Sequence, residues 1–181
     1  MSSDLQAVLE VLEMIWAPGG EAVRAQQALG VRSLSEVSPA LERGGYEVCY
    51  VDLPMKVSGF ANVIEGKPHI GLNRAKSVPH LHYTVGHELG HHILHLDTSR
   101  KSRSLSLAGI GAAEFQAHQF ATVWTFLLAN DRERQEVMTQ NPESLAIGAV
   151  MLLMTAGAIL ALLIAHVCSL LSRTLPPVPN N

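Results

Sequence analysis

The stretch His87-Glu88-Leu89-Gly90-His91 decides how the chain folds, and it lies within the run Tyr83-Thr-Val-Gly-His-Glu-Leu-Gly-His-His-Ile-Leu-His95. Positions four apart on an α-helix lie one above the other on the same face. His87 and His91 can therefore offer two imidazole nitrogens to one Zn²⁺. Glu88 lies beside the first of them, where its carboxylate can accept a proton from a water molecule that the metal activates. The pattern fixes only three positions, so a chance match on a histidine-rich helix is the alternative.

The flanking residues predict a helix with two distinct faces. Ser77-Val78-Pro79 is typical of a helix start, because proline is tolerated in the first turn. An apolar stripe runs roughly opposite the two histidines and consists of Leu81, Val85, Leu89 and Ile93. This stripe would anchor the helix in a core and leave the histidine face free for a cleft. Gly86 and Gly90 share a flank, which predicts that another backbone packs closely there.

A third metal ligand is expected on a second helix, because catalytic zinc sites usually have three protein ligands and one open position. Glu114 follows His91 by 23 residues and begins a stretch with a helical apolar pattern. His118 lies one turn after Glu114, where it could hydrogen-bond a ligand from outside the coordination sphere. The alternatives are a solvent-exposed carboxylate for Glu114 and an ordinary surface or core histidine for His118.

These motifs together resemble the ImmA/IrrE family of zinc metallopeptidases. The resemblance rests on His-Glu-Leu-Gly-His-His-Ile-Leu-His, on the Glu-x-x-Ala-x-x-Phe-Ala pattern that starts at Glu114, and on the runs 53–60 and 69–73. It covers roughly residues 46–128. It implies a compact gluzincin-like α+β domain, with His87, His91 and Glu114 as zinc ligands and Glu88 as general base. Family members are similar in cutting intracellular regulatory proteins, notably repressors of mobile-element or stress genes.

The chain departs from the family pattern in three places. His118 stands where asparagine or aspartate is more usual, and 126–130 reads Phe-Leu-Leu-Ala-Asn in place of the common Leu-Leu-Met-Pro ending. No helix-turn-helix module is evident. The last two departures weaken what the resemblance implies about the substrate, although they leave the zinc site untouched.

Residues 1–45 are expected to form short helices that pack on the core. The expected helices are Asp4–Trp16, ended by Pro18-Gly19-Gly20, then Glu21–Leu29 and finally Ser33–Arg43. A helix-turn-helix is the alternative, but this region has only three basic residues and the whole chain has a net charge of −3. Direct binding of nucleic acid is therefore not expected.

Residues 46–141 are expected to form the metallopeptidase core, with an α+β fold in which a small antiparallel sheet packs on helices. The predicted strands are Tyr46–Leu53, Val57–Ile64 and His69–Asn73. An exposed edge of the 57–73 hairpin could bind an extended substrate by strand addition. Ala129–Gln140 is polar and is interpreted as a solvated connector, which Asn141-Pro142 ends.

The end of the chain has a different composition. Leu145–Ala165 comprises 21 residues without a charge, enough to span a bilayer core of about 30 Å. A transmembrane helix over 144–171 with a short tail, 172–181, is therefore predicted; a buried core helix is the alternative. Gly157, Ala161 and Ala165 repeat every four residues, which favours homo-oligomers through one helix face.

The N-terminus does not resemble a signal peptide, and the two cysteines lie far apart, so no disulfide framework is expected. Basic residues before and after the apolar segment weakly favour a cytoplasmic catalytic domain. The sequence thus predicts a membrane-tethered Zn²⁺-dependent endopeptidase that acts on a protein or peptide, such as a transcriptional regulator. One alternative is a non-catalytic interaction or immunity protein at the membrane, whose zinc would have a fourth ligand such as His95 or His118. Another is a hydrolase that acts on substrates other than peptides.

Three features of the mechanism stay open at this point. His91 and His95 are also four residues apart, so a different ligand pair is conceivable, although no acidic residue stands beside it. The donor that stabilises the transition state is unassigned, and the candidates are Tyr83, His92, His95 and His118. The activating signal and the cleavage site do not follow from any motif.

Overall fold

The computed structural model describes residues 3–96 and 107–142, together with positions 146, 148–150, 153, 160 and 164. It divides into two compact units: residues 17–148 form one, and residues 1–16 with 149–181 form the other. The metal-binding motif and all the elements that surround it belong to the unit 17–148.

The sheet has three strands, β1 (Glu47–Val51), β2 (Gly59–Ile64) and β3 (Lys67–Asn73), in the order β1-β3-β2. β2 and β3 form an antiparallel hairpin whose turn, Glu65-Gly66, has positive φ at both residues (50° and 80°), as a tight hairpin turn requires. β1 pairs with β3 in parallel, with Glu47 opposite His69. The prediction of a wholly antiparallel sheet was therefore wrong, because β3 is inserted between the two strands that precede it.

The connection between β1 and β2 is held in place by Asn73 at the end of β3. The Asn73 side chain is fully buried, and its amide nitrogen faces the carbonyl oxygens of Leu53, Pro54 and Val57 at 3.2, 3.2 and 2.7 Å. The backbone nitrogen of Asn73 also donates to the carbonyl oxygen of Ser58 at 2.9 Å. One buried residue thus provides hydrogen-bond donors for the backbone carbonyl groups of the loop between β1 and β2.

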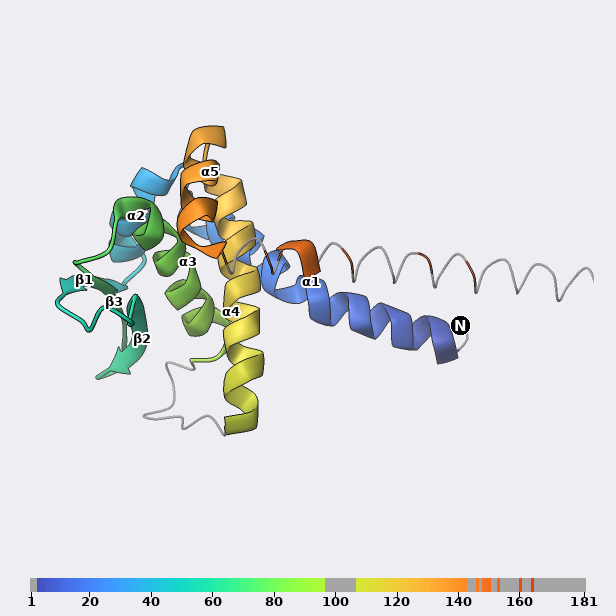
Figure 1. The fold of residues 1–181 in the computed structure, drawn as a ribbon. Helices are drawn as coiled ribbons and strands as arrows, with labels where there is room; N and C mark the ends of the chain where they lie inside the picture. Colours follow the sequence, from blue (N-terminus) through green and yellow to red (C-terminus); the bar gives the residue numbers. More distant parts are fainter. Residues whose placement is uncertain are drawn as a thin grey trace, which may run out of the picture. The chain divides into compact units, whose positions relative to one another are not determined.

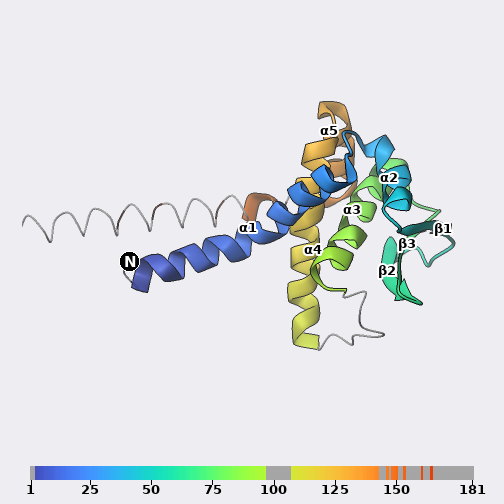
Figure 2. The same ribbon diagram turned by 180° about the vertical axis from the view of Figure 1, so that it is seen from behind.

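Helix α3 (Val78–Leu94) carries the metal-binding motif and begins where the sequence predicts, with Ser77 as N-cap accepting from the His80 backbone nitrogen. Helix α4 (Leu107–Leu128) packs along it, and α3 lies between the sheet and α4 (Figures 1 and 2). A Cβ at Gly90 would lie 3.2 Å from the Cα of Ala117, and one at Gly86 would lie 3.4 Å from the Cα of Ala121. The prediction that a backbone packs closely against these two glycines is confirmed.

The N-terminal region differs from its prediction in one element. A single helix, α1 (Ser3–Leu29), runs through Pro18, where the sequence predicted a break. Proline removes one backbone donor from the helix, but a Cβ at Gly19 would lie 3.0 Å from Val123 of α4, so packing supports the helix just after the proline. The 3₁₀ helix η1 (Leu34–Glu36) and helix α2 (Val37–Arg43) follow, as expected for 33–43.

The core of this unit joins the N-terminal helices to the sheet and to the α3–α4 pair. Its most completely buried large side chains are Val31, Leu41, Ile70, Leu72, Leu89, Phe120 and Trp124. Leu89, on the predicted apolar stripe of α3, is fully buried, whereas Ile93 at the end of that stripe is 36% exposed. The stripe therefore anchors α3 mainly through its central turns.

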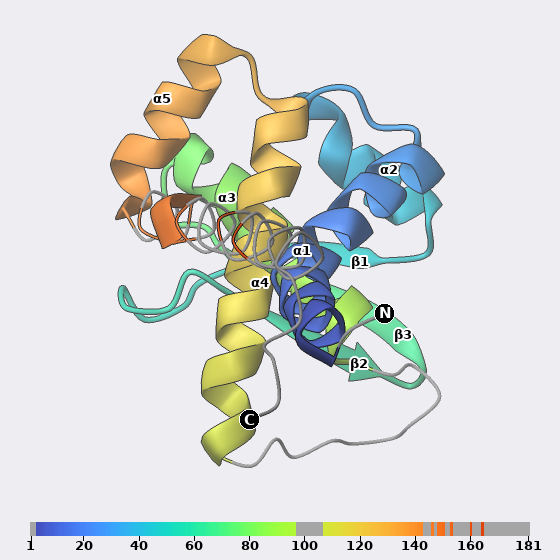
Figure 3. The same cartoon turned by 90° about the vertical axis from the view of Figure 1, so that its right-hand side faces the viewer.

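The segment predicted as a solvated connector is a short helix, α5 (Asp131–Gln140). Asn130 and Glu133 form a reciprocal capping box at its start, and Val137 is buried. The helix packs against α3, as Figure 3 shows. Its polar composition is explained by the exposure of its other faces.

The predicted transmembrane helix lies almost entirely outside the described residues. Among the residues that are described, none of the helices combines the length and the apolar character needed to cross a bilayer. The predicted domain limits at 45 and 141 and the tail 172–181 likewise stay predictions.

Candidate metal centre

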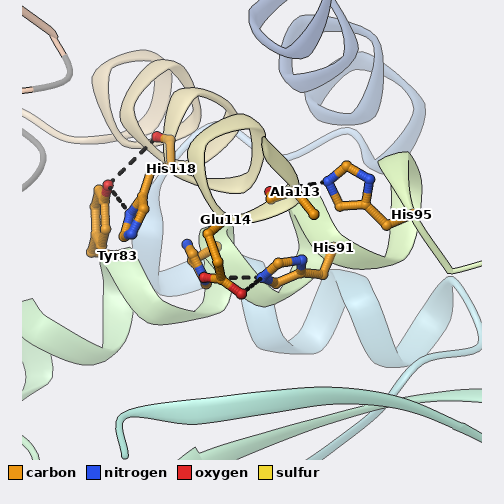
Figure 4. A network of polar contacts seen from close by, with 7 residues as sticks. Tyr83, His91, His95, Ala113, Glu114 and His118 are labelled. Carbon is orange, nitrogen blue, oxygen red and sulfur yellow. Dashed lines mark hydrogen bonds and ion pairs between the residues drawn. The ribbon is translucent and has the colours of Figure 1, made fainter. Parts of the chain in front are cut away.

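The two histidines of the motif and Glu114 converge on one point between α3 and α4. His87 Nε2 and His91 Nε2 lie 3.1 Å apart. The two carboxylate oxygens of Glu114 lie 3.2 Å from His87 Nε2 and 3.3 Å from His91 Nε2. Figure 4 shows the Glu114 carboxylate from α4 directed toward the His91 ring from α3. Among the described residues, these three form the group that could hold a metal ion.

The spacing of these atoms fits a tetrahedral zinc site. Ligand atoms about 2.0–2.1 Å from zinc at tetrahedral corners lie about 3.3 Å from one another. The three separations of 3.1, 3.2 and 3.3 Å have this size. Two imidazoles and one carboxylate are also a donor set that catalytic zinc sites use. The residues therefore fit the ion.

Glu114 is electrostatically suited to be the anionic ligand. Hydrogen bonds from His87 and His91 hold the pKa of Glu114 well below its usual range and outweigh the opposing effect of partial burial. The carboxyl group is therefore ionised at neutral pH, which is the form that binds a cation. Its side chain is 49% exposed, so the carboxylate is only partly shielded from solvent.

Glu88 lies in a different environment from Glu114, although both are glutamates at the same site. Glu88 is only 6% exposed, and burial raises its pKa despite the nearby His87 and His91. A Cβ at Gly59 of β2 would lie 3.2 Å from Glu88 Oε1 and 2.7 Å from Thr84. The carboxylate therefore lies directly beneath the edge strand, and Gly59 leaves room for it.

Two further contacts fix the side chains around the metal ligands (Figure 4). The Tyr83 hydroxyl lies 3.0 Å from His118 Nδ1, and the His118 ring centroid is 4.3 Å from that of His87. His95 Nε2 lies 3.1 Å from the carbonyl oxygen of Ala113, to which it donates when protonated. His118 is thus next to a metal-ligand candidate, as the sequence predicted, while its role in orienting that ligand stays a prediction.

His92 is used elsewhere in the molecule. Its ring packs edge-on against Tyr46, and its Nε2 lies 2.9 Å from the carbonyl oxygen of His69 in β3. His92 is absent from the lining of the cleft, whereas Tyr83, His95 and His118 line it. The other three candidates for a transition-state donor therefore remain, and His92 acts as a link between α3 and the sheet.

A cleft of about 610 Å³ contains the metal-ligand candidates and Glu88. It is lined by residues 56–61 of the loop and edge strand β2, by residues of α3, and by Glu114 and His118 of α4. Among the described strands, β2 pairs with β3 alone and forms an edge of the sheet. Residues 59–61 of this edge strand line the cleft, where an extended chain could pair with it.

Sequence reasoning missed the pair formed by Ser58 and His80. Ser58 Oγ lies 2.7 Å from His80 Nε2, and both residues line the cleft. They come from separate elements and belong to no recognisable motif. The only available signal was their position, Ser58 at the start of the predicted strand Val57–Ile64 and His80 in the first turn of the predicted helix.

Comparison with known proteins identifies one family. A family model described as IrrE N-terminal-like domain, a peptidase family, matches residues 41–171. No significant match was found among curated proteins or among solved structures. The matched range includes the strands, both helices of the metal centre and His87, His91 and Glu114.

Proposed function

Because the chain belongs to the peptidase family described as IrrE N-terminal-like domain, we propose that it is a zinc-dependent endopeptidase that cleaves an intracellular regulatory protein. The observation that carries the proposal is the convergence of His87, His91 and Glu114 next to a buried glutamate in an open cleft. Three ligands and one free position are the arrangement of catalytic zinc sites.

Each residue has a role that follows from its environment. His87, His91 and Glu114 would hold the metal, and a bound zinc ion would lower the pKa of a water molecule and polarise the scissile carbonyl. Glu88 is placed to accept the proton of the attacking water and to pass it to the leaving amine. The raised pKa of Glu88, caused by burial, suits a group that must hold a proton between the two steps.

The edge of β2 supports a peptide rather than a small molecule as substrate. Residues 57–61 line the cleft beside Glu88 and leave the outer backbone groups of the strand available within the described part of the chain. An extended peptide could add to this edge by backbone hydrogen bonds, which would place its scissile bond above the metal centre. A hydrolase for small substrates would be better served by a closed pocket.

The non-catalytic alternative requires a fourth protein ligand in place of the open position. Among the described side chains, neither His95 nor His118 belongs to the cluster that could hold the ion. His95 instead faces the Ala113 carbonyl oxygen, and His118 faces Tyr83. These contacts favour the catalytic role.

We propose further that the chain is attached to a lipid bilayer through residues 145–165. Support comes from the uncharged composition of this segment and from the exposure of apolar side chains at its described positions, 71% for Leu153 and 55% for Ile164. A tether would restrict the enzyme to substrates, such as transcriptional regulators, that come to the membrane. Homo-oligomers through the small-residue face of the segment are part of this proposal.

The metal content of the purified full-length chain tests the central assignment. We expect one zinc ion per chain in the wild type and a large loss of bound zinc in Glu114→Ala, because two histidines alone leave the ion with too few protein ligands. Absorption spectra of the cobalt-substituted protein would report the coordination number. Four protein ligands would favour the interaction-protein alternative, and no metal in a well-folded chain would refute the proposal.

A further inference from the structure

The cleft lining combines apolar and polar side chains. Its apolar members include Phe60, Ala61 and Leu96. Its polar members include Lys56 and Ser58, and Ser58 contacts His80 in the first turn of α3. The cleft is lined by two carboxylates, Glu88 and Glu114, and both belong to the metal centre. Lys56 is therefore the formally charged group in the remainder of the described lining.

We propose that the end of the cleft formed by Lys56, Ser58 and His80 binds a carboxylate of the substrate on the C-terminal side of the scissile bond. This inference rests on the proposed peptidase function and adds a substrate preference to it.

Lys56 is available for such a contact and is held near the cleft by its backbone. Its side chain forms an ion pair with none of the described residues. The loop that carries it is anchored on both sides: Asn73 faces the carbonyl oxygens of Pro54 and Val57, and Lys76 Nζ donates to the Met55 carbonyl oxygen at 2.7 Å. A fixed backbone lowers the entropy that the loop loses when a ligand binds.

Ser58 is oriented by His80. Ser58 Oγ lies 2.7 Å from His80 Nε2, and His80 Nδ1 lies 3.4 Å from the carbonyl oxygen of Gln140 after α5. The backbone carbonyl of Ser58 accepts from Asn73, so both ends of the residue are constrained. When both ring nitrogens of His80 carry hydrogen, Nε2 donates to Ser58 and leaves the hydroxyl free to donate to a ligand.

The direction of the strand relates this end of the cleft to the direction of the substrate. Ser58 contacts His80 at the start of α3, and the next residue, Gly59, lies against Thr84 and Glu88 one and two turns further along. β2 therefore runs in the same direction as α3. Antiparallel pairing is slightly more stable than parallel pairing. A substrate that pairs antiparallel to β2 runs toward the start of that strand. The residues after its scissile bond would therefore lie next to Ser58 and His80.

The carboxylate could come from an aspartate or glutamate side chain or from the C-terminus of the substrate. Short peptides capped at their N-terminus by a succinyl hydroxamate distinguish these two sources. The hydroxamate binds zinc, and the peptide then occupies the part of the cleft that receives the residues on the C-terminal side of the scissile bond. In the first pair, both peptides have an amidated C-terminus, and one contains glutamate where the other contains glutamine. In the second pair, both peptides are apolar, and one ends in a free carboxylate where the other ends in an amide.

The dissociation constants are measured by calorimetry with the zinc-loaded full-length chain, without any need for turnover. We expect the carboxylate member of one pair to bind about threefold to fivefold more tightly, the size of a solvent-accessible ion pair. Lys56→Gln and Ser58→Ala should each reduce this preference, read as the ratio of the two dissociation constants within the pair. Lys67→Gln, at an exposed lysine of β3 outside the cleft lining, is the matched control and should retain the preference.

A preference in the glutamate pair identifies a side-chain carboxylate, and one in the free-acid pair identifies a chain terminus. Equal binding within both pairs would overturn the inference alone, as would a preference that survives both Lys56→Gln and Ser58→Ala. Failure of every hydroxamate to bind a chain that contains zinc would instead refute the open catalytic site, and this inference with it.

Discussion

At the scale of single residues, a substitution of Glu88 tests peptide cleavage separately from zinc binding. Glu88→Gln keeps the size and the burial of the side chain but cannot accept a proton. We expect the variant to retain its zinc and to lose about 10²–10⁴-fold in the rate of peptide cleavage, the range of general acid–base catalysis. Metal analysis and cleavage of a peptide library, read by mass spectrometry, check this. Loss of zinc from the variant would mean that the ligand set is different.

The residues of the metal centre could be predicted because their relation is local or resembles a family pattern. His87 and His91 share one helix face by periodicity alone, and Glu114 could be inferred from the expected ligand number. Ser58 and His80 could not be paired in this way. Their contact spans 22 residues and depends on where β2 starts relative to α3. The role of Asn73 was missed for the same reason. Its side chain can contact the loop between β1 and β2 only because β3 lies between those two strands in the sheet.

At the scale of elements, the close contact of α3 and α4 determines whether Glu114 reaches the two histidines. A Cβ at Gly90 would lie 3.1 Å from Phe120 Cβ and 3.2 Å from Ala117 Cα, and neither atom is the end of a flexible side chain. Gly90→Ala should therefore push the helices apart. We expect it to lower the free energy of unfolding by about 1–3 kcal/mol and to weaken zinc binding.

Gly111→Ala is the control for this helix contact. Gly111 also lies in α4, and no atom of the other described elements lies within 4 Å of a Cβ at this position. It should be neutral or stabilise the fold by up to about 1 kcal/mol through helix propensity. Chemical denaturation and competition for zinc with a chelator measure both variants. If Gly90→Ala were as stable as Gly111→Ala, the helices would be less tightly packed than the distances indicate.

Elements were predicted well where one segment carries its own pattern and poorly where tertiary packing decides. Ser77 capped α3 as expected, and the three strands appeared near their predicted positions. The break at Pro18-Gly19-Gly20 did not form, because the helix at that point packs on Val123 of α4. The parallel pairing of β1 with β3 was missed, because strand order is not contained in the alternation of any single strand.

At the scale of the whole molecule, one buried and one half-buried histidine predict that the fold loses stability in acid. Burial lowers the pKa of His92 and of His82 below the value of about 6.5 expected in the unfolded chain. The unfolded chain therefore takes up protons first as the pH falls below about 6.5, and unfolding becomes easier. The loss of stability is at most about 1.4 kcal/mol per pH unit for each histidine.

Thermal unfolding between pH 7.5 and 5, with a chelator present so that metal release does not contribute, measures this dependence. The transition temperature should fall on the acidic side, and the fall should be smaller in the double variant His82→Gln, His92→Gln. An identical pH dependence in wild type and double variant would assign the acid sensitivity to other groups.

The composition of residues 145–165 makes a second prediction at this scale, namely that the chain sediments with membranes and resists extraction by carbonate. The segment has 21 residues without a charge, and the cost of an arginine at the centre of a bilayer is about 2.5–3.5 kcal/mol. The double variant Leu153→Arg, Leu160→Arg should therefore move to the soluble fraction. Leu127→Arg, at an exposed leucine of α4, should not. Arginines that leave the sedimentation unchanged, or a wild-type chain in the soluble fraction, would favour the alternative that the segment is a helix covered by protein, which the same apolar composition also permits.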